Sequence, residues 1–401
     1  MAESAVIRED YLNKLKRLKD LDVIKVVTGV RRSGKSTLLK QFRDWLYEQG
    51  VSGKQIVEIN LEDLQFEELE DYHLLNQYVV ERLIPGNTTY LFIDEIQNTE
   101  HFEKAINSLY LNKDIDIYIT GSNSRILSGE LSTRLSGRYV EIPILPLSLH
   151  EFSLLLAQTP HQSWERYRTE GGFPYLAYIP QKPERLDYLE GIYNTVLVKD
   201  IVERKKISNL DLFNRVTSYL MDNIGNPVNC TNISNYLTSS KEKTTRQTIQ
   251  KYLEGLKESF IFYEVRRFDI KGKELLKTNA KYYLSDIGFR QLLTRNTRRD
   301  AGHIFENLVF LELMRRGYTV TTGIIRGTEI DFVAEDSGTR FYIQAALTVE
   351  DDQTFQREIS PLLSVPDNYP KFLVTLDDWT QDVDGIRHIN GVEFLNGLPL
   401  Y

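Results

Sequence analysis

The sequence has 401 residues, of which 41% are hydrophobic and 26% charged, with a formal net charge of −8. A chain of this size can bury a sizeable core in two or three domains. The single cysteine, Cys230, excludes an internal disulfide, and no run approaches the roughly 18 apolar residues of a membrane span. The polar N-terminus lacks the layout of a signal peptide, so we expect a cytoplasmic protein with no membrane partner.

Five apolar runs in the first 145 residues alternate with segments long enough for crossover helices. This order is typical of a parallel β-sheet with helices on both faces. In such sheets ligands bind beyond the carboxyl ends of the strands, and distinctive polar residues follow the predicted strands repeatedly. The predicted strands are 23–30, 55–60, 88–95, 114–121 and 138–145.

The stretch TGVRRSGKST, residues 28–37, follows the first predicted strand and contains the full GxxxxGK[ST] pattern. Glycines let such a loop turn its N–H groups toward phosphate oxygens, and the next helix presents its positive end. We expect Lys35 to reach the β- and γ-phosphates and Ser36 to hold Mg²⁺. The alternative is a simple strand-to-helix turn. The predicted nucleotide contacts are Gly29, Val30, Arg31, Arg32, Ser33, Gly34, Lys35, Ser36 and Thr37.

Two carboxylates, Asp94 and Glu95, end the apolar run of the third predicted strand. One of them, Asp94, can position Mg²⁺, and Glu95 can orient and deprotonate an attacking water, as phosphoryl transfer requires. An isolated Asp-Glu pair at this point is more often a helix cap. Combined with the phosphate loop, the pair favours nucleotide hydrolysis over passive binding.

Further polar residues follow the fourth predicted strand and precede the fifth. A hydroxyl or amide from Thr120, Ser122 or Asn123 can sense the γ-phosphate. An arginine just before the last strand, Arg134 or Arg138, can stabilise transition-state charge in the site of a neighbouring subunit. A surface salt bridge is the alternative for either arginine.

The series GVRRSGKST, LFIDEIQ, TGSNS and GRYVEIPILPLS resembles the AAA-type ATPases, specifically a prokaryotic branch with a GxRRxGK[ST] loop and a conjoined C-terminal domain. The resemblance runs from about Val6 to the end of the chain. It implies ATP and Mg²⁺ as cofactors, a sheet ordered 5-1-4-3-2, a helical lid and often a ring of subunits. By resemblance to signal-transducing ATPases, Pro174 of the Gly172-Phe173-Pro174 turn packs against adenine; a plain glycine-proline loop is the alternative.

The middle of the chain is basic, with 20 Lys and Arg against 12 Asp and Glu between residues 199 and 300. Three helical stretches and two strands there resemble a winged helix, in which one helix enters a DNA groove and the wing touches phosphates. A solvated helical surface and a protein-contact role remain alternatives. The candidate DNA contacts are Arg246, Lys251, Lys271, Lys273 and Lys277.

The C-terminal section resembles the PD-(D/E)xK restriction-endonuclease-like fold, which implies a possible second metal site at Glu306, Asp331 and Gln344. The lysine of that fold is replaced by Ala346, and no lysine occurs from residue 282 through 370. Arginines such as Arg357 cannot take over proton transfer, because their pKa is above about 12. We therefore expect a DNA-binding or structural descendant of a nuclease, without cleavage activity.

Together these features predict an α/β protein with four parts: an AAA-type P-loop core (1–146), a helical lid (147–207), a winged helix (208–300) and a nuclease-like domain (301–401). The leading hypothesis is an ATP-hydrolysing, homo-oligomeric machine, with a hexamer as the candidate assembly, that processes DNA and has branched DNA as a candidate substrate. The alternative is a nucleotide-operated switch in signalling or defence. A reading centred on nuclease activity is the weakest, because of the missing lysine.

Overall fold

The computed structural model describes residues 6–127, 137–239, 244–276, 279–293 and 301–400. They divide into two compact units: the N-terminal unit contains residues 1–144 with 258–260, and the C-terminal unit contains residues 145–257 with 261–401. Each unit has its own sheets and core. The predicted division into four domains stays a prediction.

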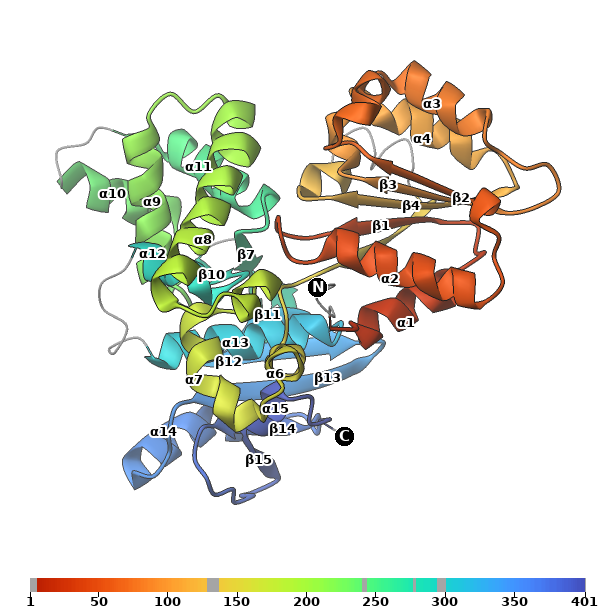
Figure 1. The fold of residues 1–401 in the computed structure, drawn as a ribbon. Helices are drawn as coiled ribbons and strands as arrows, with labels where there is room; N and C mark the ends of the chain where they lie inside the picture. The colour runs from red at the N-terminus through yellow and green to blue at the C-terminus, as the bar shows by residue number, and fades with distance from the viewer. Residues whose placement is uncertain (1–5, 128–136, 240–243, 277–278, 294–300, 401) are drawn as a thin grey trace. The chain divides into compact units, whose positions relative to one another are not determined.

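The N-terminal unit is built on five parallel strands in the order β2-β3-β4-β1-β5, which confirms the expected order 5-1-4-3-2 (Figure 1). The strands are β1 (Ile24–Thr28), β2 (Ile56–Asn60), β3 (Thr89–Asp94), β4 (Ile115–Gly121) and β5 (Tyr139–Pro143), and the helices are α1 (Glu9–Leu18), α2 (Lys35–Glu48), α3 (Tyr72–Val80) and α4 (Phe102–Tyr110).

Helices cover both faces of this sheet, which is why its central strands are continuously apolar. Val26 and Val27 are adjacent in β1 and fully buried, and they point into different cores. The core around Val26 includes side chains of α3 and α4, whereas the core around Val27 includes side chains of α1 and α2. The carboxyl edge of the sheet is thereby left for a ligand.

The C-terminal unit contains a three-stranded sheet, ordered β6-β10-β7, and a seven-stranded mixed sheet, ordered β15-β14-β13-β12-β11-β8-β9. The strands are β6 (Pro227–Val228), β7 (Phe262–Val265), β8 (Arg267–Asp269), β9 (Glu274–Leu275), β10 (Ala280–Leu284), β11 (Thr319–Ile325), β12 (Thr328–Asp336), β13 (Thr339–Ala346), β14 (Lys371–Thr375) and β15 (Ile386–Asn390).

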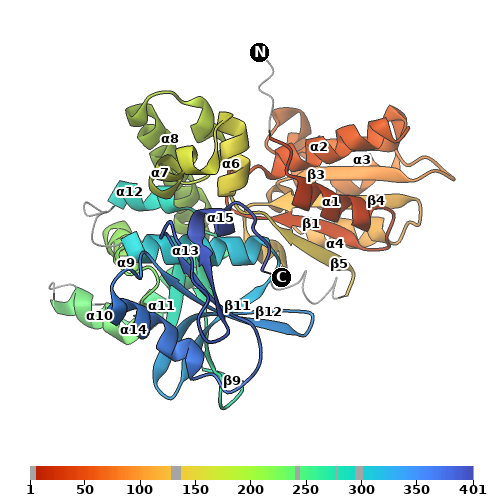
Figure 2. The same ribbon diagram turned by 90° about the horizontal axis from the view of Figure 1, so that it is seen from below.

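The helices of this unit are α6 (Leu149–Leu156), α7 (Pro160–Glu170), α8 (Lys182–Thr195), α9 (Leu210–Asp222), α10 (Cys230–Ser239), α11 (Arg246–Glu258), α12 (Arg290–Leu293), α13 (Ala301–Arg315), α14 (Asp352–Leu363) and α15 (Gly391–Leu395). Figures 1 and 2 show α13 lying across the seven-stranded sheet. There Phe310 of α13 stacks on Phe332 of β12, whereas Ile359 and Leu362 of α14 share a core with Val333. Because Phe332 and Val333 are neighbours on one strand, the two helices cover opposite faces.

One predicted strand of the basic region turns out to be two. Residues 260–268 contain β7, which pairs antiparallel with β10, and β8, which pairs in parallel with β11 of the large sheet. The chain passes from one sheet to the other at Arg266. The turn between β8 and β9 that carries Lys271 and Lys273, which we call the lysine-rich tip, therefore lies at an edge of the seven-stranded sheet. Strand periodicity cannot reveal such a change of partner, because both halves are extended.

Candidate functional site

The loop of residues 29–34 has a backbone that only particular residues can adopt. Gly29 has φ of 148°, and a Cβ there would lie 2.2 Å from the carbonyl oxygen of Ile144. Gly34, just before α2, has φ of 100° and a left-handed conformation. Both glycines are needed where the predicted phosphate loop requires close approach of the backbone.

Lys35 begins α2 and is only 4% exposed. Its Nζ atom donates to the carbonyl oxygens of Gly29, at 3.2 Å, and Val30, at 3.3 Å. The same atom lies 3.5 Å from Oε1 of Glu95. The ammonium group is therefore held inside the loop, next to the acidic end of β3.

Buried Ser33 tests whether the loop fits a phosphate. Its Oγ atom has no hydrogen-bond partner among the described residues, and an unpaired buried hydroxyl is unfavourable. An anion within the loop would supply the missing acceptor. The P-loop residues therefore fit a nucleoside triphosphate, with Lys35 to meet its phosphates and Ser36 and Asp94 to hold the accompanying Mg²⁺.

Asp94 and Glu95 are positioned by Thr120 at the end of the neighbouring strand β4. The hydroxyl of Thr120 donates to Oδ1 of Asp94 and accepts the backbone N–H of Glu95 at 2.9 Å. Glu95 has φ of 54°, in the left-handed region that non-glycine residues seldom occupy. Strain of this kind is typical of functional residues whose surroundings fix their conformation.

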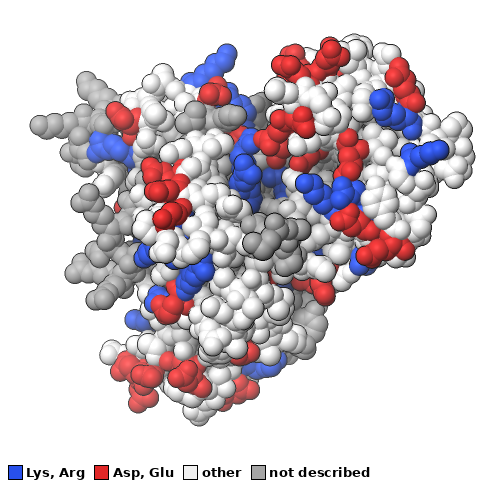
Figure 3. Space-filling view, in the orientation of Figure 1, with Lys and Arg blue, Asp and Glu red and all other residues white. Residues whose placement is uncertain are grey.

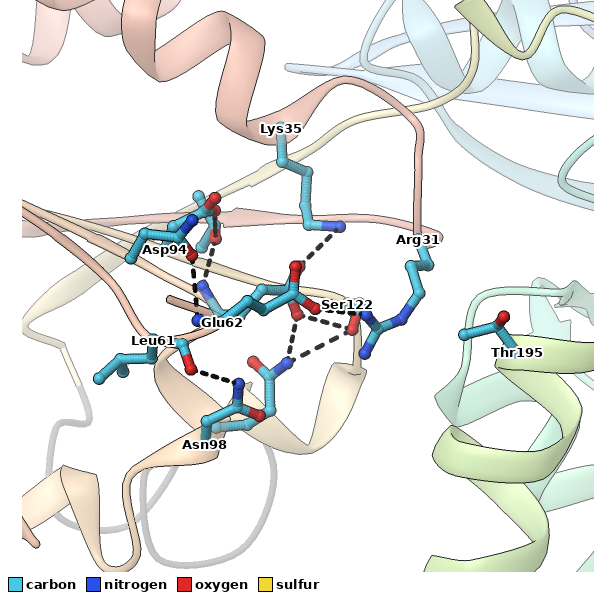
Figure 4. A network of polar contacts seen from close by, with 12 residues as sticks. Arg31, Lys35, Leu61, Glu62, Asp94, Asn98, Ser122 and Thr195 are labelled. Atoms are coloured by element: carbon cyan, nitrogen blue, oxygen red, sulfur yellow. Dashed lines mark hydrogen bonds and ion pairs between the residues drawn. The ribbon is translucent and has the colours of Figure 1, made fainter. Parts of the chain in front are cut away.

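The carboxylate of Glu95 is 6% exposed and is surrounded by donors. Ser122 donates to Oε2 of Glu95 at 2.9 Å, and the amide of Gln97 donates to the same oxygen. Burial by itself would raise the pKa of Glu95, but the charges of Lys35 and Arg31 and the two hydrogen bonds together lower it. Glu95 is therefore ionised at neutral pH. Figure 4 shows Lys35, Asp94 and Ser122 converging on this network.

Two residues of the candidate site, Glu62 and Gln97, were not predicted from the sequence. Arg31 forms an ion pair with Glu62, with 2.6 Å between Nη1 and Oε1, and both are labelled in Figure 4. Gln97 contacts Glu95 as described above. Gln97 lies two residues after Glu95 in the LFIDEIQ motif, so the sequence could have indicated that it belongs to the site. Glu62 is brought near Arg31 by the loop after β2, which no sequence motif indicates.

Three more residues were predicted to belong to the nucleotide site: two arginines and the proline expected to contact adenine. Arg138 precedes β5, at the amino edge of the sheet, where its Nη1 donates to Asn107 at 2.7 Å and its guanidinium lies over the Tyr110 ring. Arg134 lies outside the described residues. Pro174 begins a short 3₁₀ helix of the C-terminal unit. The proposed roles of all three stay predictions.

The predicted C-terminal residues contact one another only in part. Glu306 of α13 and Asp331 of β12 both approach the Nζ atom of Lys281 in β10, at 2.8 and 3.9 Å. Gln344 of β13 accepts the backbone N–H of Asp331 at 3.3 Å and donates to Glu358. Lys281 was not predicted, because the lysine of the resembled fold follows the last acid in sequence.

Comparison with known proteins now gives the family. An AAA domain matches residues 22–153, and a domain of unknown function (DUF8612) matches residues 161–300. An uncharacterized protein of Haemophilus influenzae is 40% identical over 403 residues, which cover 98% of this chain and 100% of the relative. The chain belongs to the family of this Haemophilus protein. In this chain, the AAA match includes all five strands of the N-terminal sheet.

Two further proteins are similar to this chain. An uncharacterized protein of Methanocaldococcus jannaschii is 29% identical over 331 residues, which cover 77% of this chain and 71% of the relative. The solved Walker-type ATPase of Pyrococcus abyssi has a TM-score of 0.53 and 16% identity, covering 73% of this chain and 97% of that one. The likeness to the Pyrococcus structure shows that the two proteins share a fold. Among the described helices, none is long and apolar enough to cross a membrane.

Proposed function

We propose that this protein hydrolyses ATP at the N-terminal unit and uses the cycle to act on DNA. The observation that supports hydrolysis is the single hydrogen-bonded and ionic network from Lys35 through Glu95 to Ser122. A loop that only bound phosphate would need the lysine, but not an ionised, fixed carboxylate beside it. Phosphoryl transfer needs both, because a water must be oriented against the phosphate that Lys35 holds.

Each residue of the network has a defined task in this proposal. Lys35 leaves the carbonyl oxygens of Gly29 and Val30 to meet the triphosphate, whose Mg²⁺ ion neutralises phosphate charge when bound. Glu95 orients the attacking water and accepts a proton from it. Ser122 keeps the carboxylate of Glu95 in place. Asp94, fixed by the hydrogen bond from Thr120, would hold the Mg²⁺ ion together with Ser36.

The first prediction tests nucleotide binding. Lys35→Ala should abolish binding of a fluorescent ATP analogue and reduce ATP hydrolysis by a factor of about 100 or more, because the loop loses its only ammonium. Lys40→Ala is the matched control, since Lys40 is exposed on the same helix. Unchanged turnover in Lys35→Ala, with normal turnover in the control, would show that the P-loop is not the hydrolytic site.

DNA binding is proposed for the exposed basic residues of the C-terminal unit. Arg246 and Lys251 are exposed on α11, and Lys271 and Lys273 are exposed at the β8–β9 turn, whereas Lys277 lies outside the described residues. Acidic side chains gather over α14 in Figure 3, where residues 350–352 are exposed. Phosphates would avoid that region, so we assign DNA to the α11 and β8–β9 side.

The second prediction concerns this DNA surface. Replacing Lys271 and Lys273 together by alanine should weaken binding to linear and branched DNA and reduce the salt dependence of binding by about two units of log–log slope. The double variant Lys54→Ala/Lys113→Ala removes the same charge from exposed sites of the N-terminal unit and is the control. If DNA does not change the rate of ATP hydrolysis, and the Lys271/Lys273 double variant binds DNA as the wild type does, the signalling or defence switch is favoured instead.

A further inference from the structure

A cluster of one lysine and three carboxylates, buried except for the carboxylate of Glu329, joins three elements of the C-terminal unit. Lys281 of β10 lies with its Nζ 2.8 Å from Glu306 of α13 and 2.7 Å from Glu329 of β12. The same Nζ is 3.9 Å from Asp331, also of β12. We call these four residues the Lys281 cluster. Lys281 is 2% exposed, and Glu306 and Asp331 are 7% and 8% exposed.

The carboxylates of the cluster are already supplied with hydrogen-bond donors. Tyr283 donates to Oε1 of Glu306 at 2.6 Å, and Nδ1 of His303 lies 3.5 Å from Oε2 of the same residue. Asp331 accepts the backbone N–H of Ala345 at 2.9 Å through Oδ2. Oε1 of Glu306 and Oδ2 of Asp331 are therefore already engaged by groups of the protein other than Lys281.

The charges of the cluster depend on one another. Burial by itself would lower the pKa of Lys281, but Glu306, Asp331 and Glu329 together raise it above its usual range, so the ammonium persists. Burial would raise the pKa of Glu306, yet Lys281 and two further hydrogen-bonded neighbours, His303 and Tyr283, lower it. A buried carboxylate is tolerated only with such a partner. The ion pair of 2.8 Å between Nζ of Lys281 and Oε1 of Glu306 thus gives this buried carboxylate a cationic partner.

The third residue expected at a metal site does not complete one. The side-chain oxygen of Gln344 faces the backbone N–H of Asp331, and its amide nitrogen donates to Glu358 at 2.9 Å. Within the described ranges, no group of three or more His, Cys, Asp or Glu side chains is arranged to hold a metal. The residues present therefore do not fit a resident divalent metal.

We infer that Lys281 is the built-in cation of this cluster, in place of a divalent metal, and that the cluster is a charged joint fixing β10 to α13 and β12. The lysine comes from the strand before the helix, one position ahead of the long lysine-free stretch. In this arrangement the carboxylates neutralise an internal ammonium and do not hold a metal ion that could bind the phosphodiester of DNA. The residues of the nucleotide site belong to the other unit.

The test uses the full chain without nucleotide, and Mn²⁺ as the probe. Lys281→Met should lower the Tm by about 5–15 °C, because buried carboxylates lose their partner. Millimolar Mn²⁺ should restore part of that loss in Lys281→Met but not in Lys281→Met/Asp331→Asn, where one ligand is neutral. Lys182→Met, at an exposed lysine of α8, is the matched control. It should change neither the Tm nor the effect of Mn²⁺ on the Tm.

A measurement on the wild-type protein tests the inference without depending on whether a variant folds. Equilibrium dialysis without nucleotide should detect no Mn²⁺ bound by the wild-type chain. One Mn²⁺ bound per wild-type chain, and lost in Asp331→Asn, would overturn the inference, as would an unchanged Tm in Lys281→Met. Because no nucleotide is present, failure of this inference is distinct from failure of the proposed function, which unchanged ATP turnover in Lys35→Ala would reveal.

Discussion

At the scale of single residues, Glu95 is the most constrained group of the nucleotide site. It combines a left-handed backbone, a carboxylate held by Ser122 and Gln97, and an ion pair with Lys35. Before a nucleotide arrives, this ion pair satisfies the charge of Lys35. A bound phosphate would compete with Glu95 for the ammonium, which would release the carboxylate toward water. Glu95 would thus pair with Lys35 in the empty loop and face water in the loop that holds a nucleotide.

Replacing this carboxylate gives the third prediction. Glu95→Gln should retain ATP binding, or strengthen it because Lys35 loses its competing anion, while hydrolysis falls by about 10²-fold or more. The measurements are ATP affinity by fluorescence titration and single-turnover hydrolysis. Glu100→Gln is the control, because the Glu100 side chain is 86% exposed and carries the same charge. Hydrolysis at the wild-type rate would remove Glu95 from the water-orienting role.

At the scale of elements, Asp286 holds together the turn after α7 and the short helix before α12. Its carboxylate accepts the backbone N–H of Gly172 at 2.7 Å and that of Gly288 at 2.8 Å. A Cβ at Gly171 would lie 1.7 Å from Oδ1 of Asp286. The two segments therefore meet through backbone groups, with no room for a side chain at that point.

The fourth prediction follows from burial of this carboxyl group. Burial raises the pKa of Asp286 to about 7, although both backbone N–H groups and Arg315 oppose the shift. A folded-state pKa above the unfolded value means that the stabilising contribution is complete below about pH 4 and is lost as the pH rises through 7. The free energy of unfolding of wild type, relative to Asp286→Asn, should therefore fall by on the order of 2–4 kcal/mol over that range.

Urea unfolding of wild type and Asp286→Asn at several pH values measures this difference directly. The variant also changes one hydrogen bond, but that effect is the same at every pH and cancels in the comparison. A difference between the two proteins that stays constant from pH 4 to 7.5 would mean that Asp286 keeps an ordinary pKa in the folded state.

At the scale of the whole molecule, the position of Arg138 bears on assembly. β1 and β5 are parallel and pair Ile24 with Tyr139 and Thr28 with Pro143. Arg138 thus lies at the amino edge, and the P-loop begins at the carboxyl edge, about 16–20 Å away along the strand. Arg138 cannot serve the P-loop of its own chain over that distance. A catalytic role for it would require a second copy.

Mixing two inactive variants tests a shared site and gives the fifth prediction. Arg138→Ala and Glu95→Gln should each hydrolyse ATP poorly, but an equimolar mixture should regain activity at about one site in four if random assemblies form. The Arg138→Ala chain still binds nucleotide, since its loop is intact. If Arg138→Ala alone is fully active, its contacts with Asn107 and Tyr110 are purely structural.

The sequence by itself determined the local parts of this protein. The P-loop, Asp94, Glu95 and Ser122 were predictable because each follows an apolar strand, and the carboxyl ends of parallel strands meet at one edge. The sheet order followed from the resemblance of four motifs to one family. In these places the information lies within about ten residues of chain, where periodicity and turn chemistry act.

The tertiary structure alone decided which distant side chains meet. Glu62 reaches Arg31 only through the course of the loop after β2, and the lysine-rich tip joins the large sheet because β8 pairs with β11 rather than β10. Lys281 reaches Glu306 and Asp331 because β10 lies against α13 and β12. No local pattern encodes such contacts, since they depend on how separate elements pack, and the ammonium within the C-terminal carboxylates is visible only after that packing.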